Sequence, residues 1–474
     1  MTSEVTSLHC KAHVTRAHIL YVNSFTRYEY DKIESARKNM ISSVSSSFLL
    51  VGAFVARRIR AEKKKKTSVK KTGRKVFRVY MDGCFDLMHF GHANALRQAR
   101  AIASVASTGG GGEGDVEGAG ADVELIVGLV SDEEILRCKG PPVLPEQERV
   151  KCVRAVKWVD DIIANVPYEL TKEFVEELFS EKYGIDCIVH GDDPCYLPDG
   201  TDAYAIPKAL GKYREIKRTE GVSTTDLVAR LLEYADASEN TTSKSAGDES
   251  SGGKRSEKNE RHEARFCTTA SRIAQFAAKV SYSKTSKMHE ETEKRKTDKK
   301  QRKNEKNEET TCCYVVGAFD VFNAGHVELL EECSFVADKV VCAVIADEYL
   351  TRDQTNQPPP MLNQSERAMS AIACRHCDDV VVGAPARLTD DICKTFNVTA
   401  VVFEDDDAVT ERDRNVCEKN GVQILSVKER VFSRKKLTIA KRVQANRALF
   451  EERQKRKMAS EKAYYEQKAF VAED

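Results

Sequence analysis

Short apolar runs alternate with amphipathic stretches in two separate parts of the chain. Between residues 76 and 235, KVFRVYMDG and VELIVGLV have the composition of buried strands, while HANALRQARAIA and PEQERVKCVRAVKW have helical spacing. The same alternation restarts at residue 312 and continues towards residue 474. Strands that alternate with helices predict parallel sheets with right-handed crossovers. The pattern therefore predicts an α/β protein built from two tandem Rossmann-like, doubly wound domains.

Three segments of the first patterned region recur in the same order in the second. The pairs are VYMDGCFDLMHFGH (79–92) with YVVGAFDVFNAGH (314–326), ERVKCVRAVKWVDDII (148–163) with ERAMSAIACRHCDDVV (366–381), and IDCIVHGDD (185–193) with VTAVVFEDD (398–406). Matches in one order indicate a duplicated domain rather than coincidence. We expect domains at residues 76–235 and 312–474.

The segments outside the two domains have the composition of linkers and extensions. Residues 236–311 are mostly Ser, Lys, Glu, Asn and Thr, which predicts a charged linker. Within it, residues 265–280 are apolar enough to dock on a neighbouring domain. Residues 1–75 form an N-terminal extension, in which residues 40–56 are uncharged and are followed by several Arg and Lys.

The 17 uncharged residues 40–56 lie at the lower limit for a membrane span, and the cations after them would stay on the cytosolic side. As an anchor, the segment would place the protein on the cytosolic face of the endoplasmic reticulum or of the outer mitochondrial membrane. As a disordered extension it would leave the protein in the cytoplasm, and a transit peptide is the third interpretation.

Charge and cysteine content narrow the class of partner. Lys and Arg number 75 and Asp and Glu 74, so no overall field favours nucleic acid, and we expect no nucleic-acid partner. The 15 cysteines show no disulfide spacing and indicate reduced thiols. Cys374 and Cys377 lack a second ligand pair, so no metal site on the protein is predicted.

The HxGH stretch is the strongest candidate for chemistry. Gly83 ends a predicted strand, and the next helix is expected to start just after His89. His89 and His92 are three residues apart, so both can donate a hydrogen bond to an anion at the helix N-terminus, where free backbone N–H groups also favour phosphate. By itself the motif also fits two structural histidines.

GCFDLMHFGH resembles the signature of the cytidylyltransferases, a branch of the HxGH nucleotidyltransferases, and RTEGVSTTD (218–226) resembles their second signature. Three other segments are similar to the family members that carry two such domains in tandem: HGDDPCYLPDGTDAY (190–204), FCTTASRIAQF in the linker and EKAYYEQKAF (461–470). The resemblance covers about residues 76–235 and 265–474.

The resemblance implies a reaction and its substrates. CMP would pass from CTP to phosphoethanolamine, giving CDP-ethanolamine and pyrophosphate in phosphatidylethanolamine synthesis, with Mg²⁺ bound to the CTP. A cytidylyltransferase that uses phosphocholine or glycerol phosphate is one alternative, because the acceptor is inferred only by analogy with tandem members. A non-catalytic regulator that binds CTP is another, and a homodimer is left open.

The resemblance also implies roles for individual residues. The catalytic set is His89, His92, Lys139 and Arg218. The set that holds CTP is Cys84 and Phe85 through their backbone amides, together with Arg149, Gly191, Asp192, Thr219, Ser223, Thr224 and Thr225. Tyr168 would face the substrate amine by cation–π attraction, or else cap the core. Lys139 and Arg218 have the ordinary alternative of surface cations in water or in ion pairs.

The second copy is predicted to be catalytically dead. Its histidine pair is reduced to Asn323 and His326, and an asparagine cannot carry positive charge. Val316 stands at the position of Asp82, and Phe403 at that of His190. VFSRKKLTI aligns with RTEGVSTTD without its RT pair, and TRDQTNQPPP has no lysine to match Lys139. Residues 312–474 are therefore expected to be a packing or regulatory partner, with at most weak nucleotide affinity at 317–320.

Overall fold

A computed structural model describes residues 76–105, 122–243, 270–297 and 310–459, except for 194, 196, 198–199, 220, 284–285, 289, 296, 352–358, 406–407, 428–430 and 457–458. The chain divides after Gly73 into two units, and the described residues all belong to the second unit. In that part of the chain no helix combines the length and hydrophobicity needed to cross a bilayer. The candidate anchor at 40–56 lies outside the described residues, so it stays a prediction.

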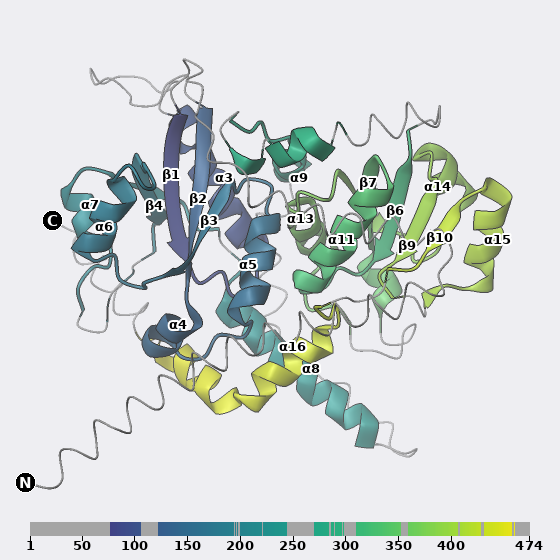
Figure 1. The fold of residues 1–474 in the computed structure, drawn as a ribbon. Helices are drawn as coiled ribbons and strands as arrows, with labels where there is room; N and C mark the ends of the chain where they lie inside the picture. The colour runs from purple at the N-terminus through teal and green to yellow at the C-terminus, as the bar shows by residue number, and fades with distance from the viewer. Residues whose placement is uncertain are drawn as a thin grey trace, which may run out of the picture. The chain divides into compact units, whose positions relative to one another are not determined.

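The first patterned region forms a parallel sheet with helices between its strands (Figure 1). Its elements are β1 (Val76–Gly83), α3 (Phe90–Val105), β2 (Asp122–Val130), α4 (Asp132–Lys139), α5 (Glu146–Ala155), β3 (Asp161–Val166), α6 (Lys172–Phe179), β4 (Cys187–Gly191), α7 (Ala205–Ala209), β5 (Tyr213–Ile216) and α8 (Thr224–Ser243). The strand order is β3-β2-β1-β4-β5, and every pairing is parallel. The order reverses between β1 and β4, which is where doubly wound sheets bind ligands.

The second patterned region repeats this topology. Its elements are β6 (Cys312–Gly317), α11 (Ala324–Val336), β7 (Lys339–Ile345), the 3₁₀ turn η2 (Asp347–Leu350), α13 (Gln364–Ile372), β8 (Asp379–Ala384), α14 (Asp390–Thr395), β9 (Ala400–Phe403), α15 (Glu411–Asn420), β10 (Gln423–Leu425) and α16 (Lys436–Ala445). The sheet order β10-β9-β6-β7-β8 is that of the first domain read from the other edge, again all parallel. The predicted fold class, two tandem Rossmann-like domains with parallel sheets, is confirmed.

The two sheets owe their stability to strands that are apolar on both faces. Val79 and Tyr80 in β1 are fully buried, as are Val315 in β6 and Val341 in β7. Parallel strands covered by helices on both sides are expected to be this uniformly apolar. The buried strands hold the loops at their carboxyl ends in place, and those loops carry the candidate site.

The domains contact each other reciprocally. Helix α5 packs on α11, and its counterpart α13 packs on α3, the counterpart of α11. Val156 forms an antiparallel bridge with Cys374, where Lys157 N donates to Ala373 O at 3.0 Å and Arg375 N to Ala155 O at 2.8 Å. Equivalent elements of the two domains therefore contact each other in the same way as in a two-fold symmetric dimer, although both domains belong to one chain. A homodimer would therefore need another surface, and that part of the prediction remains untested.

The helix predicted over PEQERVKCVRAVKW extends three residues beyond the C-terminal end of the observed helix. Helix α5 ends at Ala155, because Val156 turns into extended backbone to make its bridge with Cys374. The local spacing of the sequence carries no sign of this partner, which lies in the other domain.

Helix α9 (Ala270–Ala277) is the described helical part of the expected docking segment. Phe276 is fully buried, and its ring meets that of Trp158 edge to face with centroids 5.2 Å apart. Lys157 Nζ donates to the Phe276 carbonyl at 3.0 Å. The segment thus packs on Lys157 and Trp158, next to Val156, which forms the bridge to the second domain.

Candidate active site

The loop after β1 has an unusual backbone that is repeated after β6. Phe85 and Leu87 have φ values of 47° and 51°, and Phe319 and Val321 have 52° and 51°. Left-handed backbone at non-glycine residues costs free energy and persists only where packing enforces it. All four side chains are buried. The core therefore holds this loop in a fixed shape in both domains.

The two predicted catalytic histidines lie together at the start of α3. His89 Nδ1 accepts hydrogen bonds from the backbone N–H groups of Gly91 at 3.1 Å and His92 at 3.4 Å. The two rings stack with centroids 3.9 Å apart. Because Nδ1 of a neutral His89 acts as an acceptor, its proton belongs on Nε2, and Nε2 is therefore the nitrogen that can donate to an anion.

Gly91, between the two histidines, has no room for a side chain. A Cβ at this position would lie 2.7 Å from Cγ1 of Val222 and 2.9 Å from His89 Nδ1. Val222 precedes α8, so the glycine lets the second signature approach the first closely. The two signatures, far apart in sequence, thus form one site.

Lys139 reaches the same loop from a helix that the sequence analysis did not predict. It is the last residue of α4, which Ser131 begins by accepting a hydrogen bond from Glu134 N at 3.2 Å. Its Nζ lies 3.9 Å from Cys84 Sγ. The nearby Cys84 sulfur raises the pKa of Lys139, desolvation opposes this, and Tyr168 adds to the increase. The S-x-x-E spacing of residues 131–134 was the missed signal for this helix.

Tyr168 lies beside Lys139. The Lys139 ammonium is 5.1 Å from the centroid of the Tyr168 ring, and the Tyr168 hydroxyl is 3.6 Å from Cys195 Sγ. Burial raises the pKa of the Tyr168 hydroxyl. One ring face already receives a cation from the protein. Contact with the substrate amine therefore remains a prediction.

Arg218, Asp192 and Gly191 lie where β4 and β5 end. Gly191 is the last residue of β4, and Asp192 N donates to the carbonyl of Ile216 in β5 at 3.0 Å. The Asp192 carboxylate accepts from Arg218 N at 2.8 Å, and the Arg218 guanidinium lies 3.9 Å from the carboxylate of Asp193. The Arg218 side chain is 36% exposed, so it can reach an incoming anion.

The remaining residues predicted to bind CTP lie at the start of α8 and just before it. The buried Thr219 hydroxyl accepts from Asn94 Nδ2 at 2.9 Å. Ser223 Oγ accepts from Asp226 N at 3.1 Å, which caps the helix. Thr224 donates to the carbonyl of Asp86 at 3.1 Å, and Thr225 is half-buried.

Arg149 is buried beneath the loop after β1 and contacts its backbone. Its Nη1 donates to the carbonyl of Cys84 at 2.8 Å, and its Nη2 pairs with Asp132 Oδ1 at 2.5 Å. The side chain has no exposed surface. A direct contact between Arg149 and CTP stays a prediction. In this structure the residue orients the backbone that precedes Phe85.

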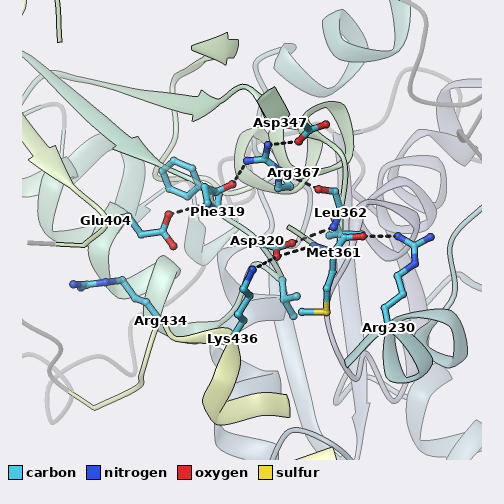
Figure 2. Close-up of polar contacts among 12 residues, drawn as sticks. Arg230, Phe319, Asp320, Asp347, Met361, Leu362, Arg367, Glu404, Arg434 and Lys436 are labelled. Carbon is cyan, nitrogen blue, oxygen red and sulfur yellow. Dashed lines mark hydrogen bonds and ion pairs between the residues drawn. The ribbon is translucent and has the colours of Figure 1, made fainter. Parts of the chain in front are cut away.

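The second domain has the same arginine in the same place. Arg367 donates to the carbonyl of Ala318 and pairs with Asp347 at 2.7 Å (Figure 2). An arginine that survives in a copy without the histidine pair is explained by this packing role and not by chemistry.

Two buried aspartates lie near the site: Asp82, which the second copy replaces with Val316, and Asp86 of the GCFDLMHFGH stretch. Asp82 accepts a hydrogen bond from the Tyr204 hydroxyl at 2.9 Å, and burial raises its pKa, although His190 and Tyr204 act against this. Asp86 accepts from the N–H groups of Val143 and Leu144 at 2.8 and 2.9 Å. Neither of them is assigned a role from the sequence, and only the fold shows which groups they contact.

Over the described ranges, no group of three or more His, Cys, Asp or Glu side chains is placed to hold a metal ion. The chemistry that the geometry offers is that of anion binding. Backbone amides, two histidines, a lysine, an arginine and a helix N-terminus gather at the carboxyl ends of β1, β2, β4 and β5. Such a set can bind a polyphosphate and stabilise negative charge that develops on it.

Comparison with known proteins points to one family. The sequence model of the cytidylyltransferase-like family matches residues 117–230 and 314–461. An ethanolamine-phosphate cytidylyltransferase of Arabidopsis thaliana is 39% identical over 415 residues, which are 85% of this chain and 88% of that protein. Proteins of the same name from Dictyostelium discoideum and Mus musculus are 36% and 33% identical, over 84% and 83% of this chain and 98% and 92% of their own lengths.

Proposed function

The chain belongs to the ethanolamine-phosphate cytidylyltransferases of the cytidylyltransferase-like family, and from this membership we propose how its first α/β domain carries out the reaction. The enzyme transfers CMP from CTP to phosphoethanolamine, giving CDP-ethanolamine and pyrophosphate. This reaction is a step in phosphatidylethanolamine synthesis.

One observation carries the assignment to the first domain. Its cationic and hydroxyl side chains lie at the carboxyl ends of the strands on both sides of the switch point between β1 and β4. His89, Gly91 and Val222 are in direct proximity there, and Lys139 reaches Cys84 from the β2 side. Two phosphate-bearing substrates need such a convergence of positive charge before they can meet.

In the proposed reaction a phosphate oxygen of phosphoethanolamine forms a bond to the α-phosphorus of CTP. The bond from that phosphorus to the oxygen of the leaving pyrophosphate breaks in line with it. The enzyme contributes positioning and charge stabilisation rather than a covalent intermediate. His89 and His92 would donate hydrogen bonds to the oxygens of the α-phosphate as their charge increases.

The remaining residues would hold the two phosphate-bearing substrates in place. Lys139, which is cationic at neutral pH as lysines ordinarily are, would bridge the donor and acceptor phosphates. Arg218 and the start of α8 would hold the pyrophosphate part of CTP. Backbone amides of the loop after β1 would contact the nucleotide, and Gly191 with Asp192 would face the cytosine.

Magnesium fits this site only through the substrate. The described part of the domain offers no carboxylate cluster for a metal, so a magnesium ion would be bound by the triphosphate oxygens of CTP. It would neutralise part of the charge of the leaving pyrophosphate.

The identity of the acceptor is tested by comparing the activity of the enzyme with different acceptors. We expect purified full-length protein to release pyrophosphate from CTP with phosphoethanolamine at least about tenfold faster than with phosphocholine or glycerol phosphate, since about 1.4 kcal/mol of differential binding suffices for this. Pyrophosphate release is measured with each acceptor separately. Equal rates with phosphocholine would refute the specificity, and no release with any acceptor would favour a CTP-binding regulator.

A membrane anchor at 40–56 is proposed on the sequence pattern alone. Deletion of residues 1–60 is expected to move the protein from the membrane fraction to the supernatant while leaving turnover unchanged, because the described site begins after residue 76. The measurement is cell fractionation followed by the activity assay. If the full-length protein is already in the supernatant, the segment is not an anchor.

A further inference from the structure

The second domain contains a carboxylate at the position where the first domain has a glycine. The register of β1 with β4 pairs Val79 with Cys187, and that of β6 with β9 pairs Cys313 with Ala400. Counting four residues onward from Cys187 and from Ala400 aligns Gly191 with Glu404. The end of β9 thus carries a side chain that the end of β4 lacks.

Glu404 turns back into the loop after β6 (Figure 2). Its Oε2 accepts a hydrogen bond from Phe319 N at 2.9 Å, and its Oε1 lies 2.9 Å from Nε2 of His326. The backbone of Ala318 also contributes a hydrogen bond. Gly317 makes room for the carboxylate, since a Cβ there would lie 2.3 Å from Oε2.

The carboxylate is well buried and charged. The Glu404 side chain is only 18% exposed, and that of His326 has no exposed surface. Burial raises the pKa of Glu404, but the hydrogen bonds from His326 and from the two backbone amides outweigh it and hold the pKa at about 2. An anion therefore occupies this loop at neutral pH.

Each donor to Glu404 has a counterpart in the first domain. Ala318 and Phe319 correspond to Cys84 and Phe85, and His326 corresponds to His92. These counterparts are the groups proposed above to hold CTP, so the inference rests on the proposed function.

We propose that the second domain retains the nucleotide-phosphate site of the fold and that Glu404 fills it as a built-in anion. The site is cryptic: it would accept the phosphates of a nucleoside triphosphate if the carboxylate were removed. The glutamate satisfies the same amides and histidine that a phosphate would, and it keeps the left-handed loop in its shape without any ligand. The weak nucleotide affinity expected at 317–320 is then absent in the native chain.

The first test counts CTP molecules bound per full-length chain by equilibrium dialysis. Wild-type protein is expected to bind one CTP, and the Glu404→Gly variant, which recreates the glycine of the first domain, is expected to bind a second. Glu404→Gln is the matched control: it loses the charge but still fills the space, so it is expected to remain at one.

Photolabelling with an azido derivative of CTP, followed by mass spectrometry of the peptides, assigns each binding event to a domain. In Glu404→Gly the new label is expected in peptides from residues 312–456. A second CTP on the wild-type chain, or no second-domain label on Glu404→Gly, overturns the inference. If the first domain is not labelled, the proposed function is contradicted. The comparison of second-domain label between wild type and Glu404→Gly still decides the proposal about Glu404.

The reciprocal change keeps the proposal testable if Glu404→Gly folds poorly. Gly191→Glu is expected to weaken CTP binding at the first domain by at least about tenfold, since a new carboxylate would compete for the same donors. Gly191→Gln adds equal bulk without charge and is expected to weaken it less. Its nearest obstacle, the Asp193 carboxylate at 2.5 Å from a Cβ, is a side chain near the surface. A Gly191→Glu variant that binds CTP as tightly as the wild type would refute the built-in anion.

Discussion

Replacing His92 with alanine in the full-length chain is expected to lower the turnover of CDP-ethanolamine synthesis by about a hundredfold or more, as loss of one oxyanion-type donor does. His92 is the third residue of α3 and its ring stacks on that of His89, so it is placed to donate to the α-phosphate as charge develops there. Its loss should act on kcat more than on the KM for CTP, because the interaction strengthens in the transition state. Steady-state kinetics with varied CTP measures both.

The second domain offers a matched control for His92→Ala. His326 occupies the equivalent position but pairs with Glu404, so His326→Ala is expected to lower thermal stability and to leave kcat nearly unchanged. Near-normal turnover in His92→Ala, or an equal loss of kcat in His326→Ala, would contradict the assignment of the chemistry to the first domain.

The double variant His89→Ala with His92→Ala is expected to lose CDP-ethanolamine synthesis down to the background of the assay. Both histidine donors of the first domain are then gone, and the second domain cannot replace them because Asn323 carries no charge and His326 is engaged by Glu404. Product formation is measured by chromatography of labelled CDP-ethanolamine. Substantial synthesis by this protein would show that the second domain is catalytically active.

If the double alanine variant folds poorly, His89 can instead be replaced by asparagine, the residue that occupies the equivalent position in the second domain. Asn323 Oδ1 accepts from Gly325 N at 2.9 Å, just as His89 Nδ1 accepts from Gly91 N. His89→Asn should therefore keep the helix cap while removing the Nε2 donor. A folded His89→Asn, His92→Ala protein with substantial synthesis would contradict the prediction as directly as the alanine pair.

The asparagine of the second copy also explains how its loop survived the loss of chemistry. One hydrogen bond acceptor at this position is needed to cap the helix, and Asn323 supplies it. Arg367 and Asp320 likewise keep the packing roles of Arg149 and Asp86. The second copy lacks His89 and Lys139, two cationic side chains that we propose to serve the ligand in the first domain.

The sequence by itself determined the fold class, the duplication and the set of candidate residues, because these depend on local information. Apolar periodicity marks strands and helices within a few residues, and the two signatures identify the loops that close on a ligand. Aligning the two copies of the sequence shows directly that the second copy lacks the histidine pair. Helix α4, with its cap at Ser131, was also within reach of local signals.

Tertiary structure alone decided how distant groups pair. The guanidinium of Arg149 donates to the carbonyl of Cys84, 65 residues away in the chain, a contact that its place in the sequence does not reveal. The ring face of Tyr168 is taken by Lys139, and His326 pairs with Glu404 across 78 residues. Spacing along a chain records which residues share a helix face or a strand. It does not record which side chain at the end of a neighbouring strand will pair with a buried polar group, because that pairing depends on the packing of the whole sheet.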